Sequence, residues 1–327
     1  MLKIFKSNQP FVNVIVVLIA IALGLPIFFT EPPTVVDANL FRFSEFFNSI
    51  NNTTWLRYIL WCAFTIGIGY YLNYIVNRYK LVTNNTHVPF IIYVVLQTLF
   101  PAVLIFSPTQ IIMVFILFIL HQSNELYNTR KETLKTFNLG FFMGLAAILY
   151  LPIGFLALLV WFIMRYYKPP YWKEYIVSLM GVLVPFVYLL AYYFIFNEFS
   201  IDKIFFIETA TETSAPINES WSLNQLLFFI VMGLVFLYAL WHFVIATQKS
   251  VVRVRKYRSV ILLLILGIVL QHFIFLKNAT INADFFALLS IPLSVIISNL
   301  LIEIKKRWIA ETIFIIFFVL MLINYLR

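Results

Sequence analysis

Charged residues are scarce in this chain of 327 residues. Lys and Arg number 23 and Asp and Glu 14, which is 11% of the sequence, whereas hydrophobic residues make up 62%. Because soluble domains are about one quarter charged, there are too few charges here to cover a water-facing surface. This composition excludes a soluble enzyme, a disordered protein and a coiled coil, and it predicts an integral membrane protein.

Cysteine and the motifs of soluble catalysis are also missing. The single cysteine, Cys62, lies in an apolar stretch, so neither a disulfide framework nor a thiolate metal site is expected. His87, His121 and His242 have no second ligand at metal-binding spacing, and no Walker loop, GxGxxG, GxSxG or CxxC motif occurs. We therefore predict no metal and no cofactor, and nucleotide-driven transport by this chain alone is not indicated.

Long apolar runs, in contrast, are abundant. A helix needs roughly 20 apolar residues to cross the hydrocarbon core of a bilayer. Seven runs approach or exceed this length: 11–29, 56–76, 174–196, 223–247, 259–276, 285–302 and 309–325. The predicted fold class is therefore all-α, a polytopic bundle of transmembrane helices that forms one integral membrane domain over residues 1–327.

Two further apolar stretches, 88–121 and 136–164, are interpreted as hairpins. Both flanks of 136–164 are basic, and basic flanks favour the cytoplasmic side of a membrane. A turn near Pro152 keeps both flanks on that side, and a turn near Pro108 does the same for 88–121, because proline interrupts a helix. The four hairpin arms and the seven runs together predict about eleven crossings with the N-terminus in the cytoplasm.

The hairpin arms are short for crossings. Backbone that turns at membrane depth must be covered by protein or line a wet cavity, so these breaks point to a cavity, although tight packing without a cavity is an equally good interpretation of each one. Gly140 and Gly144 form a GxxxG step in one arm, which predicts close helix packing.

The charges then divide between the two sides. Most Lys and Arg residues fall in the predicted cytoplasmic loops, 77–87, 122–136, 165–173, 248–258 and 303–308. Most acids fall in the predicted outward loops, 30–55, 198–222 and 277–284. Topology thus explains the net charge of +9. Membrane lipids are the expected partners, and nucleic acid is not.

The first outward loop offers two catalytic candidates. Apolar residues recur at helical spacing over 40–50, which predicts an amphipathic helix in the membrane interface. Asp37 or Glu45 could act there as a general base toward a substrate hydroxyl. The alternative is that Asp37 caps the helix and Glu45 is merely solvated.

Three other residues are candidates for binding the phosphate of a lipid. Lys277, in the third outward loop, could hold a phosphate as a point charge. His272 lies about one and a half turns before it, and Arg42 belongs to the first outward loop. The alternative for Lys277 is a lysine that extends to the interface without any ligand.

The order of these features resembles the GT-C superfamily of glycosyltransferases that use polyprenyl-phosphate sugars. The first run leads into an acid-bearing outward loop, and the second ends in the basic turn 77–81. Residues 137–146 look like the family's aGxxxGLa segment, and residues 284–292 are similar to its late passage ending in proline. The resemblance covers most of the chain as topology.

The resemblance implies a GT-C-like enzyme at the outer face of a bacterial cytoplasmic membrane, with a polyprenyl phosphate as carrier lipid. It implies that Asp37 is the acidic side chain that acts in catalysis and that Lys277 contacts the carrier phosphate. Many family members have Glu directly after this Asp, whereas Ala38 follows it here. Two other functions therefore stay open: a non-catalytic subunit or scaffold of a membrane complex, and a transporter of lipids or small molecules.

Overall fold

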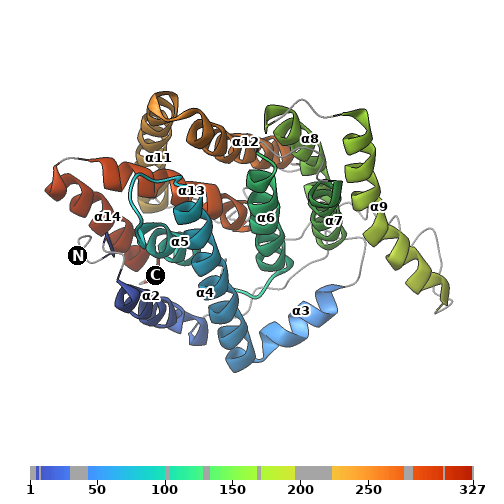
Figure 1. Ribbon diagram of the computed structural model, residues 1–327. Coiled ribbons are helices and arrows are strands. Elements are labelled where there is room, and N and C mark those ends of the chain that lie inside the picture. The colour runs from blue at the N-terminus through green and yellow to red at the C-terminus, as the bar shows by residue number, and fades with distance from the viewer. Residues whose placement is uncertain are drawn as a thin grey trace.

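The computed structural model describes residues 5–6, 9–29, 43–99, 104–127, 133–167, 171–195, 223–275, 283–304 and 306–325. Within these ranges all regular elements are helices and none is a strand (Figure 1). The predicted all-α class is therefore confirmed for the described part of the chain.

Each of the seven apolar runs forms a helix. They are α2 (Pro10–Leu23, continued by the 3-10 helix η1, Leu25–Phe28), α4 (Thr54–Arg78), α9 (Trp172–Ile195), α11 (Leu223–Lys249), α12 (Val252–Phe275), α13 (Ala283–Glu303) and α14 (Arg307–Tyr325). The hairpin stretches form α5 (Val88–Thr98), α6 (Pro108–Glu125), α7 (Thr133–Leu149), the 3-10 helix η3 (Leu151–Phe155) and α8 (Leu156–Tyr167). The first outward loop contains α3 (Phe43–Asn52).

Five helical segments of the described chain are long and apolar enough to cross a membrane: Phe11–Phe28, Thr54–Arg78, Trp172–Ile195, Val252–Ile274 and Asp284–Glu303. These lengths fit a membrane protein, but the prediction of eleven crossings is not confirmed. One reason is that three of the four hairpin arms are short: α5, α7 and α8 have 11, 17 and 12 residues. The 11 residues of α5 rise about 16 Å at 1.5 Å per residue, which is roughly half of a hydrocarbon core.

The short helix α5 lies in the interior of the molecule. All its residues are buried, and it packs against α2, α4, α13 and α14. An uninterrupted apolar sequence suits this position because no face of the helix meets water. Its polar end is also paired, since the Gln97 amide donates to Ser290 Oγ at 2.7 Å.

The second hairpin doubles back at its proline. Pro152 belongs to η3, which separates α7 from α8. Lys135, at the start of α7, lies 3.4 Å from Glu125 at the end of α6. Tyr167, at the end of α8, donates a hydrogen bond to Asn124 on the same turn of α6. The two ends of the hairpin therefore lie beside one helix terminus.

The first hairpin returns to the same place. The side-chain amide of Asn77 pairs with both backbone groups of Thr86 at 3.2 Å, which fixes the start of α5 beside the end of α4. Arg78 binds Glu125, at the end of α6, with an N–O distance of 2.9 Å. Between these points the chain leaves the helical conformation before Pro108.

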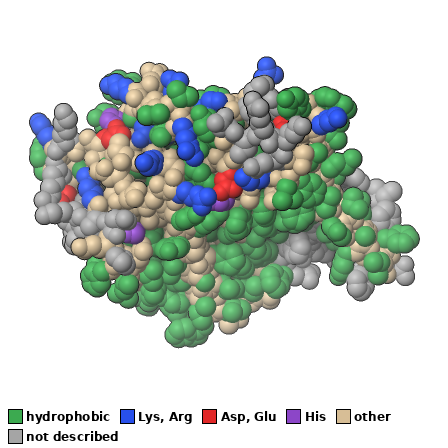
Figure 2. Space-filling view, viewed as in Figure 1, with side chains coloured by type: hydrophobic (Ala, Val, Ile, Leu, Met, Phe, Trp, Pro, Cys, Tyr) green, Lys and Arg blue, Asp and Glu red, His purple; other side chains and the backbone are tan. Residues whose placement is uncertain are grey.

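Further helix termini join this cluster through Arg258, near the start of α12. Its guanidinium is buried and donates to Leu81 O at 2.9 Å and to Asn299 Oδ1 at 3.1 Å. Glu303, at the end of α13, lies 3.7 Å from both Arg258 and His242. We call this part of the molecule the basic end. Figure 2 shows Lys and Arg gathered over the upper half of one face, above a hydrophobic surface.

The GxxxG step packs α7 closely against α9, which lies at the edge of the molecule (Figure 1). A Cβ atom added to Gly140 would lie 2.0 Å from Ser178 O, and one added to Gly144 would lie 2.4 Å from Val182 O. Gly181 makes the reciprocal contact, because its Cβ would lie 2.4 Å from Phe137 O. The predicted close packing is confirmed.

This contact can be tested with Gly140→Ala. Because the new methyl would meet backbone rather than a movable side chain, we expect a loss of about 1–3 kcal/mol of stability. The control is Gly67→Ala, also within a helix, where a Cβ would meet nothing within 4 Å. Thermal unfolding in detergent should show a lower midpoint for Gly140→Ala only. Equal midpoints in the two variants would contradict the packing.

Candidate functional site

Most of the predicted site residues lie outside the part of the chain that the structure describes. Asp37, Arg42 and Lys277 lie outside the described residues. Glu45 belongs to the first turn of α3, and its side chain also lies outside the described part. His272, near the end of α12, is described.

The predicted amphipathic helix of the first outward loop is present as α3. Phe47 and Ile50 are buried against Phe106, the residue before Ser107-Pro108, whereas Phe46 is largely exposed. The apolar face of α3 therefore covers Phe106, just before the start of α6, at the end of the molecule opposite the basic end. We call this the opposite end.

Asn51 fixes this contact. Its amide nitrogen donates to Phe106 O at 3.0 Å, and its Oδ1 accepts from Phe106 N at 3.0 Å. Both backbone groups are thus satisfied where the chain is not helical, which an apolar surrounding requires. The sequence gives no signal for this pairing, because the two residues are 55 positions apart.

A polar cluster lies at the opposite end, where α6 and α13 begin and α12 ends. Thr109 Oγ1 donates to Asp284 Oδ1 at 2.6 Å. The ring of His272 stacks on Phe285, with ring centroids 4.1 Å apart, and its buried Nε2 has no hydrogen-bond partner. We call Thr109, Asp284 and His272 the opposite-end cluster.

The structure thus brings His272, a predicted site residue, close to Asp284, which was not predicted as a site residue. Asp284 was expected only as one of the outward acids, and Thr109 was not singled out at all. Thr109 is 175 positions from Asp284, so only the packing of α6 on α13 reveals the pair. The described residues contain no group of three His, Cys, Asp or Glu side chains that could hold a metal ion.

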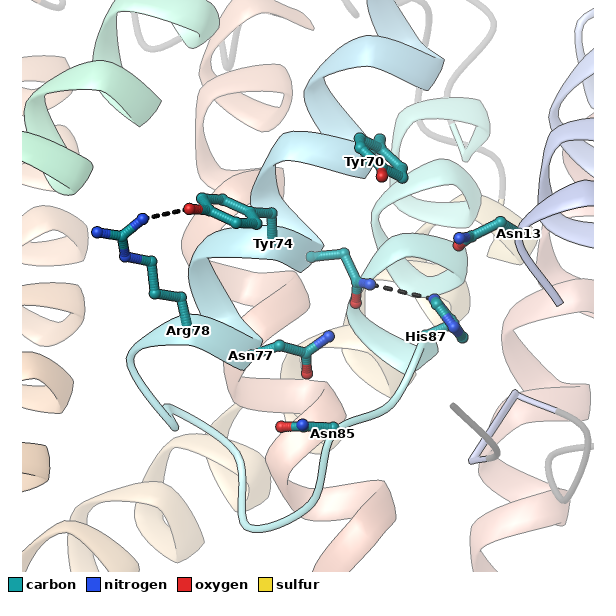
Figure 3. Close-up of a pocket in the computed structure, with 8 residues that line it drawn as sticks. Asn13, Tyr70, Tyr74, Asn77, Arg78, Asn85 and His87 are labelled. Atoms are coloured by element: carbon teal, nitrogen blue, oxygen red, sulfur yellow. Dashed lines mark hydrogen bonds between the residues drawn. The ribbon is translucent and has the colours of Figure 1, made fainter. Parts of the chain in front are cut away.

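A second polar region is a cavity of about 350 Å³ on the side of α4, close to the basic end (Figure 3). Its lining is rich in amides and tyrosines and includes one arginine: Asn13, Tyr70, Asn73, Tyr74, Asn77, Arg78, Asn85 and His87. In Figure 3, Asn13 and His87 lie on one side of the cavity, and Tyr74 and Arg78 lie on the other. No residue of this cavity was a candidate in the sequence.

Two buried side chains of the cavity are bonded to each other. Asn73 Nδ2 lies 3.2 Å from His87 Nδ1, and the two residues are 5% and 6% exposed. Burial lowers the pKa of His87, so the imidazole is neutral at pH 7. Asn73 Oδ1, His87 Nε2 and Asn13 Oδ1 are buried without a partner.

The whole sequence, residues 1–327, matches a protein family described as "Family of unknown function (DUF6427)". The chain belongs to this family. No curated protein and no solved structure matches it. Membership of DUF6427 therefore supplies no activity.

Replacing Asn51 tests how the opposite end is held. Asn51→Leu leaves the N–H and C=O of Phe106 buried and unpaired, so we expect a loss of about 2–5 kcal/mol. Asn51→Asp keeps one acceptor and should lose less. Asn52→Leu is the control, because this neighbour is exposed. Thermal unfolding in detergent is the measurement, and an unchanged midpoint for Asn51→Leu would contradict the role of the pairing.

Proposed function

We propose that the protein is a membrane glycosyltransferase that uses a lipid-linked sugar at the opposite end. In this proposal the basic end faces the cytoplasm and the opposite end faces outward, in a bacterial cytoplasmic membrane. The basic loops supply the orientation, since positive charge is retained on the cytoplasmic side. The resemblance to the GT-C superfamily supplies the reaction class.

The observation that carries the proposal is the opposite-end cluster. The Asp284 carboxylate accepts a hydrogen bond from Thr109. The ring of His272 stacks on Phe285, the residue after Asp284, and its buried Nε2 has no partner. Ionisable side chains within membrane segments are costly and are kept where they serve a function. A carboxylate and an imidazole with a free nitrogen are groups suited to proton transfer and to phosphate binding.

The helix α3 connects this cluster with the first outward loop. Asn51 anchors α3 to Phe106, and residues 30–42 precede this helix in the sequence. That segment contains Asp37, and Glu45 is part of α3 itself. The proposed base, Asp37, belongs to the same predicted outward loop as this helix.

The proposed reaction is transfer of the sugar to an acceptor hydroxyl. Asp37 takes the proton of the acceptor hydroxyl while the oxygen of that hydroxyl bonds to the anomeric carbon of the sugar. The bond from that carbon to the phosphate oxygen breaks, and the polyprenyl phosphate leaves with the bonding electron pair. Lys277, Arg42 and His272 are proposed to stabilise the charge on the leaving phosphate.

The proposal can be tested by sugar transfer in membranes that contain Asp37→Asn. Labelled polyprenyl-phosphate glucose, mannose, galactose and arabinose are supplied as donors. Loss of a general base lowers transfer roughly 100- to 10,000-fold. Asp284→Asn should lower it by about tenfold, because one charge-assisted hydrogen bond is weakened.

The control is Glu212→Gln, which removes an acid from another predicted outward loop and should leave transfer unchanged. All variants must reach the membrane at equal levels. Wild-type transfer in Asp37→Asn would contradict the catalytic role. Absence of transfer from all four donors by the wild-type protein, together with stable co-purifying partners, would support a non-catalytic subunit instead.

A further inference from the structure

Three tyrosines bring the ends of different helices together at the basic end. Tyr127 follows α6, Tyr167 ends α8, and Tyr257 lies in the second turn of α12. The ring of Tyr257 lies 5.8 Å from that of Tyr127 and 6.0 Å from that of Tyr167, and the latter two are 6.3 Å apart, in each case edge to face. We call these three residues the tyrosine cluster.

Two cations of α12, Arg253 and Lys256, are held on this cluster. The guanidinium carbon of Arg253 lies 5.9 Å from the ring centroid of Tyr127, and its Nε donates to the Tyr257 hydroxyl at 2.9 Å. Lys256 Nζ lies 5.3 Å from the ring centroid of Tyr127 and donates to Tyr167 O at 3.0 Å. Because positions three apart share a face of a helix and both cations contact the same ring, Arg253 and Lys256 form one positive patch.

The patch is open to an incoming ligand. Arg253 is exposed, and its two terminal nitrogens have no partner among the described residues. Within the same part of the chain, no carboxylate forms an ion pair with Arg253 or Lys256. The two terminal nitrogens of a guanidinium match two oxygens of a phosphate, so the patch suits an oxyanion.

These cations lie at the start of a helix, which is its positive end. Acids are favourable at that end and cations are not, yet the first turn of α12 has no acid and its first five residues include Arg253, Arg255 and Lys256. Membrane orientation explains positive charge on the cytoplasmic side, but it does not require a guanidinium that is fixed on aromatic rings. A bound anion accounts for both features.

The surface around the patch suits the level of lipid head groups. Val251 and Val252, directly before Arg253, are 75% and 51% exposed, and exposed apolar residues beside cations are typical of the boundary between head groups and acyl chains. Trp172 at the start of α9 and Trp308 at the start of α14 are also largely exposed. Tryptophan is enriched at the same level of a membrane.

We infer that Arg253 and Lys256 bind the phosphodiester of an anionic phospholipid at the start of α12. The terminal nitrogens of Arg253 donate to two phosphate oxygens, and the ammonium of Lys256 adds a second positive charge. Basic pockets between the cytoplasmic ends of membrane helices bind anionic head groups. A head group without an ammonium of its own is preferred, because Arg253 and Lys256 have no carboxylate partner in the described chain.

The experiment is native mass spectrometry of the delipidated full chain with added phosphatidylglycerol or phosphatidylethanolamine. We expect phosphatidylglycerol to bind. Phosphatidylethanolamine should bind about tenfold more weakly, because its ammonium cancels the charge of its phosphate. Equal binding of the two lipids would overturn the assignment of an anionic head group.

A matched pair of variants locates the site. Arg253→Gln should weaken binding of phosphatidylglycerol about tenfold, since it removes a charge-assisted hydrogen bond. Arg255→Gln is the control, because Arg255 is exposed on the same helix turn and makes no contact with the tyrosine cluster among the described residues. It should weaken binding far less. Equal losses in the two variants would indicate diffuse attraction to the basic loop and would overturn the site.

The tyrosine cluster is tested separately at Tyr127, whose ring contacts both cations. Tyr127→Leu removes the ring and should weaken binding about threefold. Tyr127→Phe keeps the ring and should bind as the wild-type protein does. Wild-type binding by Tyr127→Leu would contradict the role of the ring in holding Arg253 and Lys256.

Glycerophosphoglycerol distinguishes a lipid from a soluble ligand of the same chemistry, because it has the same phosphodiester without acyl chains. We expect it to compete with phosphatidylglycerol only weakly, since it cannot use the apolar surface at Val251 and Val252. Competition at equal affinity would overturn the lipid assignment. Sugar transfer is not measured in any of these experiments, so their outcome is independent of the proposed enzymatic function.

Discussion

An apolar surrounding offers no hydrogen-bond partner to a backbone that leaves its helix, and this constraint governs the architecture. The chain breaks helical structure near Pro108 and again near Pro152. At the first break, α3 covers Phe106, and Asn51 pairs with both backbone groups of this residue. The second break continues as a 3-10 helix, in which the backbone groups keep local partners. Two short hairpins are thereby possible in a chain that is 62% hydrophobic.

The two breaks also determine where the charges lie. Because each hairpin returns to its starting end, the termini of α4, α6, α7 and α8 meet around Glu125 and Asn124, and α12 and α13 join them through Arg258. In the described part of the chain, the opposite end carries few charges, among them Asp284. This separation places the cavity on α4 near the basic end and the proposed reaction site at the other end.

Much of the fold was predictable from the sequence because apolar runs and prolines act locally. The seven runs, the two breaks, a helix in the first outward loop and close packing at Gly140 and Gly144 all follow from composition and spacing. The complete burial of α5 was not predictable, because it depends on contacts with four other helices. The pairs Asn51–Phe106, Thr109–Asp284 and Asn73–His87 join separate elements, and residue types alone do not indicate which side chains will meet. Asp37, Arg42 and Lys277 stay predictions.

The central claim is that the chain doubles back at Pro108 and Pro152, so that positively charged helix ends collect on one side of a membrane. Cys62 is the only cysteine, so a Cys62→Ala background permits labelling of single introduced cysteines at exposed positions. A membrane-impermeant maleimide applied from each side of sealed vesicles is the most direct measurement. The account predicts that Leu134→Cys and Arg165→Cys are labelled from the same side, and Asn52→Cys from the other. Labelling of Leu134→Cys and Arg165→Cys from different sides would contradict it.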